Sequence, residues 1–346
     1  MIKPKRLKEG SRIAIISPSN GLPFLFSDIY ELGLKNLREI LGFELVEMKT
    51  ARMSPEELYN NPRLRAEDIN NAFKDESIDG IITSIGGCES VRILKYLDKD
   101  LIINNPKFIM GFSDATTFLT YLNQLGMITF YGPSVMAGFA QLENLPKSYI
   151  NHIKAILFEG VIPYSYKPYE KWVDGYKDWN NKETIGQCTE FNDNKDGWKF
   201  LQGKEDAEGI LWGGCIEVLE FLKSTDYWPS KDFWQDKVLF FETSEDKPSP
   251  SQVESMLRNY GIQGIFNKVK AIIFGRPKDY SKEEKEELNQ SILRVVKDEF
   301  ENSSMPIVVD VDFGHTDPKL ILPIGARIKL NPDTSELILI EDPFQP

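Results

Sequence analysis

The sequence predicts an α/β protein, in which a doubly wound, mostly parallel sheet is followed by a smaller C-terminal α/β domain. Three observations lead to this prediction. In the first 135 residues, short β-rich runs alternate strictly with stretches of helical periodicity, the pattern of parallel strands covered by helices on both faces. This alternation stops between about residues 160 and 208, and it resumes after residue 208. The chain has 346 residues, 41% of them hydrophobic, which suffices for one large or two medium domains.

The first half is predicted to contain five strands and four helices. Apolar runs predict strands at 12–17, 43–47, 80–84, 107–111 and 127–131. Apolar residues at helical spacing predict helices at 28–41, 55–73, 90–97 and 114–125. Gly42 follows the first helix, where a glycine commonly ends a helix.

The second half is predicted to form a separate domain. Residues 160–208 contain three tryptophans, several tyrosines and few aliphatic residues, which indicates a long connection or lid with little regular structure. We expect an N-terminal domain at 1–165, a connecting segment at 166–207 and a C-terminal domain at 208–346. Strands are predicted near 209–212, 237–241, 269–274, 306–311, 326–330 and 336–340, and helices at 216–223, 249–260 and 281–300.

Composition narrows the class of protein. The chain carries 41 Lys and Arg against 53 Asp and Glu, a net charge of −12, which disfavours binding to nucleic acid or to an anionic membrane. Three scattered cysteines argue against a disulfide framework and a zinc cluster, and we expect no cofactor. No apolar run is long enough for a membrane span or a signal-peptide core, so we expect a cytoplasmic protein.

Imidazole suits proton transfer near neutral pH, and the chain has only two histidines. His152 lies in an amphipathic helical pattern, where a solvated surface histidine is expected. His315 follows an apolar strand and Gly314, with Pro318 just beyond. Functional sites of α/β proteins form at such strand ends, so His315 is the candidate base.

Ser113 occupies the predicted turn between a strand ending at Phe112 and a helix beginning at Asp114. This placement resembles a nucleophile elbow, in which the first helical amides face the atom that the serine attacks. The amide of Asp114 and the helix dipole could then stabilise an oxyanion. The same placement also suits an ordinary helix N-cap, and Ala115 breaks the G-x-S-x-G pattern.

Two further strand ends carry candidate residues. Gly86 and Gly87 follow the third strand, where they could supply a second oxyanion amide or simply form a tight turn. Cys88, the next residue, is an alternative nucleophile. Glu242 ends a hydrophobic strand, a costly position for a carboxylate without a partner, and orienting a histidine is one such partnership.

Other acidic residues compete with Glu242 for that role. Asp310, Asp312 and Asp317 flank His315, and Glu245 or Asp246 could cap the turn after Glu242. Glu242 is preferred because it lies at a strand end, like Ser113 and His315.

Several segments together resemble the LD-carboxypeptidase family of serine peptidases, including its microcin C immunity branch. They are 10–18 (GSRIAIISP), 85–87 (IGG), 96–98 (YLD), 111–114 (GFSD), 213–214 (GG), 228–229 (WP), 274–277 (FGRP), 314–318 (GHTDP) and 322–325 (LPIG). The segment 242–245 (ETSE), with a proline downstream, is more similar to the immunity branch than to the murein carboxypeptidases.

The resemblance implies a catalytic triad of Ser113 as nucleophile, His315 as base and Glu242 as its orienting carboxylate. The amides of Gly87 and Asp114 would form the oxyanion hole. It also implies an N-terminal domain related to class I glutamine amidotransferases, and a cytoplasmic homodimer without a metal.

The resemblance leaves the substrate open between two branches. Murein-type members cleave an amide between an L- and a D-centre of peptidoglycan peptides. Immunity-type members cleave the amide joining an aminoacyl group to a modified nucleotide, with a tryptophan stacked on the base. Trp179 is the candidate for that contact and Trp172 the reserve, although either could be a packing aromatic. Arg276 could bind a substrate carboxylate or phosphate, or form a structural ion pair.

These expectations favour a serine hydrolase of the immunity-like branch that cleaves amides of small peptide-like or aminoacyl-nucleotide substrates. A murein LD-carboxypeptidase that releases D-Ala is the alternative within the family, and a catalytically inert ligand-binding module is the alternative of another class. The segment 213–217 (GGCIE) departs from the microcin-processing members, which carry Asn-type residues there.

Overall fold

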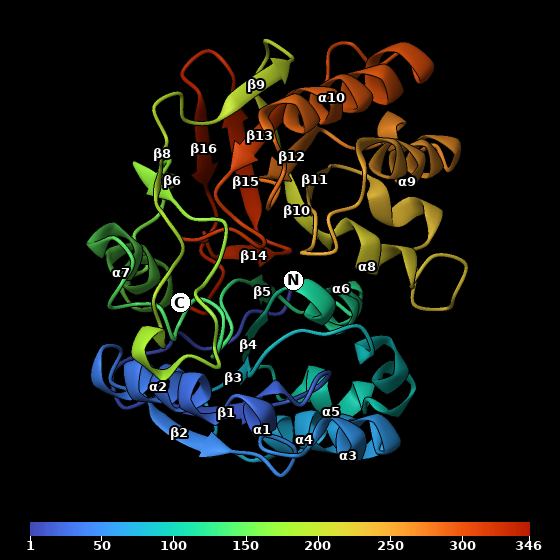
Figure 1. The fold of residues 1–346 in the computed structure, drawn as a ribbon. Helices are drawn as coiled ribbons and strands as arrows, with labels where there is room; N and C mark the ends of the chain where they lie inside the picture. Colours follow the sequence, from blue (N-terminus) through green and yellow to red (C-terminus); the bar gives the residue numbers. More distant parts are fainter.

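The computed structural model describes all 346 residues and contains two large sheets flanked by helices (Figure 1). The first sheet has six strands in the order β14-β5-β4-β3-β1-β2. Its five N-terminal strands are parallel, and β14 runs antiparallel to β5. The strands are β1 (Arg12–Ile16), β2 (Glu44–Glu47), β3 (Gly80–Thr83), β4 (Phe108–Gly111), β5 (Thr129–Tyr131) and β14 (Leu322–Ile324). The predicted α/β class and the five N-terminal strands are confirmed.

The helices around this sheet differ from the prediction at several places. Two short helices, Leu22–Leu25 and Lys99–Asn104, were not predicted, and the helix expected at 114–125 is preceded by a 3-10 turn at Ser113–Ala115. The helix expected at 55–73 is divided at Asn61, because Pro62 lacks an amide hydrogen and begins a new helix. The helix expected at 90–97 is a 3-10 helix at Ser90–Tyr96. The α-helices are α1 (Leu22–Leu25), α2 (Ser27–Glu39), α3 (Pro55–Asn60), α4 (Pro62–Lys74), α5 (Lys99–Asn104), α6 (Thr116–Gln124) and α7 (Lys147–Lys154).

The second sheet has eight strands in the order β6-β16-β15-β10-β11-β12-β13-β9. Its four central strands, β10 to β13, are parallel to one another, and the outer strands are antiparallel. The elements are β10 (Ala207–Cys215), β11 (Lys237–Glu242), β12 (Ala271–Gly275), β13 (Ile307–Val311), β15 (Arg327–Asn331), β16 (Glu336–Leu339), α8 (Ile216–Glu220), α9 (Pro250–Ile262) and α10 (Lys282–Leu293). This sheet therefore has more strands than the N-terminal one.

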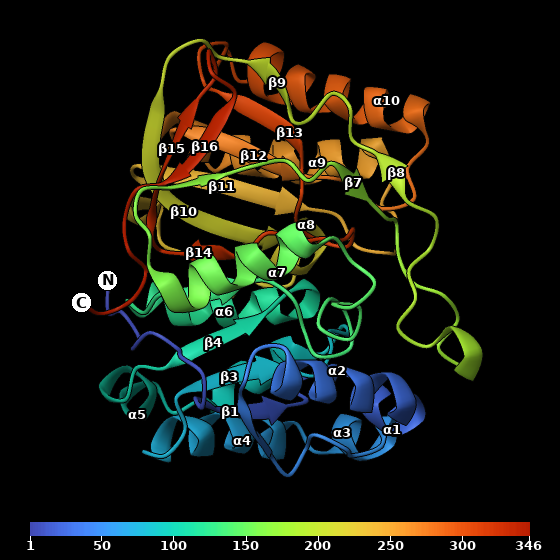
Figure 2. The same cartoon turned by 90° about the vertical axis from the view of Figure 1, so that its left-hand side faces the viewer.

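Residues 160–208 are more regular than their composition predicts. They supply β6 (Tyr164–Tyr166) and β9 (Lys199–Gln202), which are the two edges of the second sheet, and the small ribbon of β7 (Lys171–Trp172) and β8 (Asn192–Asp193). The rest runs along the outside of the molecule, where a yellow-green loop projects from the body (Figure 2). These strands are short and mix polar with aromatic residues, so they lack the apolar run on which the prediction relied.

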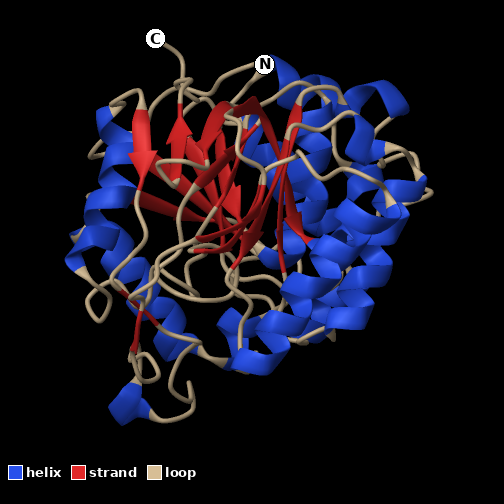
Figure 3. Cartoon of the chain, turned by 90° about the horizontal axis from the view of Figure 1, so that it is seen from above, coloured by secondary structure: helices blue, strands red, loops and turns tan.

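The two halves of the chain are joined by one shared strand and by a shared hydrophobic core. β14 comes from the C-terminal segment but completes the N-terminal sheet, and one continuous hydrophobic core includes residues of both sheets. Seen from above, the strands lie inside a partial shell of helices (Figure 3). No helix of the structure has the length and apolar character needed to cross a membrane.

His152 corrects the expectation of a solvated surface histidine. It is 4% exposed, its Nδ1 is 2.8 Å from the Tyr164 hydroxyl, and its Nε2 accepts the amide of Ile321 at 2.8 Å. Burial lowers the pKa of His152 to about 3. Helical periodicity could not reveal that β6 and the chain before β14 cover this face of α7.

Candidate active site

The turn after β4 holds Ser113 in a strained backbone conformation. Ser113 has a φ of 58°, which is uncommon for a residue other than glycine and is typical of functional turns. Its amide donates to the Tyr131 hydroxyl at 2.9 Å. Gly86 approaches so closely that a β-carbon there would lie 3.2 Å from Ser113 Oγ. The turn therefore presents the hydroxyl beside the glycine loop that follows β3.

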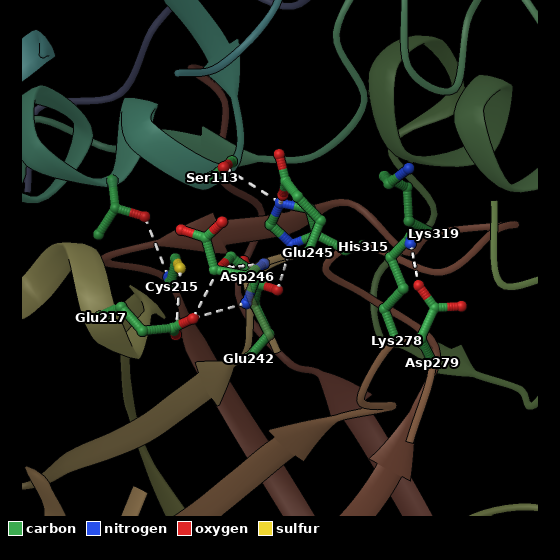
Figure 4. A network of polar contacts seen from close by, with 12 residues as sticks. Ser113, Cys215, Glu217, Glu242, Glu245, Asp246, Lys278, Asp279, His315 and Lys319 are labelled. Atoms are coloured by element: carbon green, nitrogen blue, oxygen red, sulfur yellow. Dashed lines mark hydrogen bonds and ion pairs between the residues drawn. The ribbon is translucent and has the colours of Figure 1, made fainter. Parts of the chain in front are cut away.

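Ser113, His315 and Glu242 form a continuous chain of hydrogen bonds between the two halves of the protein (Figure 4). His315 Nε2 lies 3.1 Å from Ser113 Oγ, and His315 Nδ1 lies 2.7 Å from Glu242 Oε2. Glu242 is 1% exposed, and its Oε1 accepts the Tyr131 hydroxyl at 2.5 Å. Gly314 permits this approach, since a β-carbon there would lie 2.6 Å from Glu242 Oε2.

Two carboxylates control the protonation of His315. Burial favours the neutral ring and lowers its pKa, but Glu242 and Glu245 outweigh burial and raise the pKa of His315 to about 10. Glu245 Oε2 lies 2.7 Å from His315 Nε2, on the same nitrogen that faces Ser113. Glu245 therefore belongs to the site, whereas the sequence suggested only a cap for the turn.

The loop after β3 and the turn after β4 are tied together by the Asp114 carboxylate. Asp114 Oδ2 accepts the Ser19 hydroxyl at 2.5 Å, the Glu89 amide at 3.0 Å and the Ser90 amide at 2.8 Å. Gly87 has a φ of 149°, and a β-carbon there would lie 2.3 Å from Ser19 Oγ, so only glycine fits. The backbone that carries both candidate oxyanion amides is thereby fixed by a buried carboxylate.

A cavity of about 300 Å³ opens onto these residues. Its lining includes Ser113, His315, Gly87, Glu245, Lys278 and Trp179. Trp179 also lines a neighbouring, more open cavity of about 390 Å³. Its ring stacks on Tyr176 at 6.0 Å between centroids, and the Tyr176 hydroxyl donates to Asp317 at 2.5 Å. The predicted Trp179 thus lies next to the candidate triad.

Arg276 and the reserve tryptophan lie elsewhere. Arg276 is 4% exposed and forms a buried ion pair with Asp312 at 2.8 Å. The Trp172 ring stacks on the Arg276 guanidinium, 4.7 Å from ring centroid to Cζ. Arg276 therefore has a structural partner, and neither residue lines the cavity beside Ser113.

Among the competing residues, Asp312, Asp317 and Cys88 have other partners or surroundings, whereas Glu245 contacts His315. Asp312 pairs with Arg276, and Asp317 pairs with Lys319 at 2.8 Å. Cys88 lines a different cavity, together with Ser19, Asn20 and Tyr59 among others. Burial and the nearby Asp114 charge raise the pKa of the Cys88 thiol, which disfavours a thiolate nucleophile.

Two residues of the site were not predicted from the sequence. Tyr131 follows Phe130 in an apolar strand, and its hydroxyl reaches Glu242 only because the two sheets meet there. Glu245 is one of several acids in an exposed loop, and its sequence context contains no sign of a contact with His315.

Comparisons with known proteins identify the family of this chain. Residues 13–132 match the LD-carboxypeptidase N-terminal domain and residues 208–330 match the LD-carboxypeptidase C-terminal domain. The chain is 28% identical to the microcin C7 self-immunity protein MccF of Escherichia coli over 302 residues, covering 87% of this chain and 85% of that protein. It is 26% identical to a protein of Bacillus subtilis named "Probable murein peptide carboxypeptidase" over 334 residues, covering 95% of this chain and 91% of that protein.

Solved structures extend the likeness to the whole fold. MccF in complex with aspartyl sulfamoyl adenosine has a TM-score of 0.86 and 26% identity, covering 100% of both chains. An MccF-like protein from Streptococcus pneumoniae in complex with AMP has a TM-score of 0.86 and 28% identity, covering 96% of this chain and 99% of that one. With both family domains matched in order, the chain belongs to the LD-carboxypeptidase family of serine peptidases, and its likeness includes the MccF branch.

Proposed function

We propose that Ser113, His315 and Glu242 are the catalytic triad of this peptidase. We also propose that its substrates are aminoacyl nucleotides in which an amide joins the aminoacyl group to the nucleotide. The observation that carries the proposal is the hydrogen-bond chain from Ser113 Oγ through His315 to Glu242. Ser113 and His315 line a cavity that Trp179 also lines. A serine, a histidine and a buried carboxylate in this order are the arrangement of nucleophile, base and orienting group in serine hydrolases.

The reaction proceeds in two halves. Ser113 Oγ attacks the amide carbonyl carbon while its proton passes to His315 Nε2, and the amides of Gly87 and Asp114 bind the carbonyl oxygen as it becomes negative. His315 then gives this proton to the leaving nitrogen, so that the amide bond breaks and an ester to Ser113 remains. Water, deprotonated by His315, hydrolyses the ester. Glu242 keeps Nδ1 protonated throughout and stabilises the imidazolium.

The nucleotide preference rests on Trp179 and the second cavity. Purine bases stack readily on an indole ring, and Trp179 lines both the cavity of Ser113 and a neighbouring one of about 390 Å³. The solved relatives include complexes with aspartyl sulfamoyl adenosine and with AMP. A murein LD-carboxypeptidase activity is the second candidate, favoured by the Bacillus relative.

Hydrolysis of two substrates side by side tests this proposal. One is an aminoacyl sulfamoyl adenosine, and the other is a murein tetrapeptide ending in D-Ala. We expect the wild type to cleave the first, Trp179→Ala to raise its KM by roughly tenfold or more through lost stacking, and Ser113→Ala to lower kcat by at least about 10³-fold. Release of D-Ala alone would replace the nucleotide proposal with the murein one. Cleavage of neither would favour an inert binding module.

We also propose that the protein is a cytoplasmic homodimer, as the family resemblance implies. Sedimentation velocity at micromolar concentration should give a species of twice the chain mass of 39.7 kDa. A single species at the monomer mass would contradict this.

A further inference from the structure

A second carboxylate lies against the nitrogen that has to accept the serine proton. Glu245 Oε2 is 2.7 Å from His315 Nε2, closer than Ser113 Oγ at 3.1 Å. Since a carboxylate only accepts hydrogen bonds, this contact needs a proton on Nε2, just as the Glu242 contact needs one on Nδ1. With Glu245 in this position, His315 is an imidazolium and cannot take a proton from Ser113.

The two carboxylates on His315 differ in how firmly they are held. Glu242 is fully buried and also accepts the Tyr131 hydroxyl. The Glu245 side chain is 63% exposed, and its one ion pair is with His315. Glu242 is therefore a fixed part of the site. Glu245 can move away from His315 at little cost once another cation becomes its ion-pair partner.

No unpaired cation of the cavity lining competes with a substrate cation for Glu245. Lys278, on the loop after β12, lines the same cavity but is paired with Asp279. Asp246 is the next residue along the chain, and Glu242 lies on the far side of the His315 ring (Figure 4). Apart from His315 and Lys278, the residues lining this cavity carry no positive charge.

We propose that Glu245 is a specificity-determining residue that binds the α-ammonium group of the substrate's acyl residue and thereby releases His315 for catalysis. This inference rests on the proposed function, in which the acyl residue is an amino acid. The scissile carbonyl has to lie between Ser113 and the oxyanion amides, and Glu245 lines the same cavity as Ser113 and Gly87, so an α-ammonium two bonds from the carbonyl carbon is within reach of its carboxylate. A charged partner there replaces the imidazolium as the partner of Glu245.

The proton balance of this exchange is simple. When Glu245 transfers to the ammonium, His315 loses one of its two stabilising carboxylates and releases its Nε2 proton to water. The neutral ring then takes the proton of Ser113 Oγ as that oxygen attacks. A substrate whose amine is acylated offers Glu245 no cation, and His315 stays protonated.

Labelling of Ser113 by an uncharged fluorophosphonate tests the contact without any amide substrate. Removing one close carboxylate lowers a histidine pKa by about one unit or more, so Glu245→Gln should label about tenfold or more faster at pH 7. Asp246→Asn removes the same charge one residue away and should label like the wild type. Methylammonium chloride, compared with equal sodium chloride, should accelerate labelling of the wild type but not of Glu245→Gln. The inference would be overturned if the pH at which labelling is half-maximal were the same in Glu245→Gln as in the wild type. It would also be overturned if methylammonium had no effect on the labelling rate of the wild type.

A matched substrate pair tests specificity directly. The pair is an aminoacyl sulfamoyl adenosine with a free amine and the same compound acetylated on that amine. We expect the wild type to prefer the free amine by about tenfold or more in kcat/KM, as for loss of one charged hydrogen bond. Glu245→Gln should cleave the two at similar rates. Equal cleavage by the wild type would contradict the role of Glu245. Cleavage of neither compound would reject the proposed substrate class, and the two labelling experiments would then decide the inference by themselves.

Discussion

At the scale of single residues, Tyr131 is the residue that connects the two halves of the site. Its hydroxyl donates to Glu242 Oε1 at 2.5 Å and accepts the amide of Ser113 at 2.9 Å. It therefore fixes the turn of Ser113, the proposed nucleophile, and the carboxylate of Glu242, the proposed orienting group, with one oxygen atom. Burial and the Glu242 charge raise the pKa of Tyr131 well above its ordinary value, so it remains a donor throughout the working pH range.

Tyr131→Phe should impair catalysis more than folding. A hydrogen bond to a charged group is worth about 1.5–3 kcal/mol, so its loss should lower kcat/KM by about 10- to 100-fold. Steady-state kinetics and urea unfolding of the same samples separate the two effects. Tyr260→Phe is the matched control, because the Tyr260 hydroxyl is buried without a hydrogen-bond partner. Unchanged kinetics in Tyr131→Phe would show that this connection is dispensable.

The residues differ in how readily the sequence reveals them. Ser113, Glu242 and His315 could be predicted because each lies at or just after the carboxyl end of an apolar strand, where sites of α/β proteins form. Their meeting could not be predicted, because β4 belongs to the first sheet and β11 and β13 belong to the second. Tyr131 and Glu245 could not, since their roles depend on which strand of one sheet meets which loop of the other. Arg276 was ambiguous for the same reason: the sequence does not reveal that Asp312 lies beside it.

At the scale of elements, the Asp114 side chain couples three strand ends. Its Oδ2 binds Ser19 after β1, and the amides of Glu89 and Ser90 after β3, while its own backbone follows β4. The sequence drew attention to the amide of Asp114 alone. The carboxylate is a positioning group, because it fixes the loop that contains Gly87 relative to Ser113.

Asp114→Asn should lower kcat by roughly tenfold with little change in KM, because the oxyanion amides act mainly in the transition state. The amide retains the shape of the carboxylate but binds the three donors less strongly. Asp98→Asn is the control, since Asp98 caps α5 and asparagine caps helices equally well. A variant that raises KM and leaves kcat unchanged would argue against oxyanion positioning.

Residues 160–208 show where element prediction fails. Their few aliphatic residues predicted little regular structure, yet β6 and β9 form the edges of the second sheet. Edge strands have one unpaired side and need no continuous apolar run, so pairing with β16 and β13 determines them. The same segment supplies Tyr176 and Trp179, which are held beside the site by the contact of Tyr176 with Asp317.

At the scale of the whole molecule, His152 connects α7, β6 and the chain before β14. Its folded-state pKa of about 3 lies below the ordinary value of 6.5, so the unfolded chain binds an extra proton between these values. Its contribution to stability is therefore complete above pH 6.5 and is lost as pH falls toward 3, by roughly 1.4 kcal/mol per pH unit.

His152→Gln tests this linkage, because glutamine can still accept the Ile321 amide but does not titrate. The free energy of unfolding of the wild type, minus that of the variant, should decrease as pH falls from 6.5 to 4.5. Urea unfolding at several pH values measures this difference. A difference independent of pH would mean that His152 is already protonated in the folded protein.

The central claim is that Ser113 is the nucleophile, activated by His315 and Glu242. The most direct measurement is peptide mapping by mass spectrometry after reaction with a fluorophosphonate. We predict one adduct, on Ser113, which His315→Ala forms at least about 10³-fold more slowly than the wild type does. An adduct on another residue, or amide hydrolysis that survives in Ser113→Ala, would contradict the account.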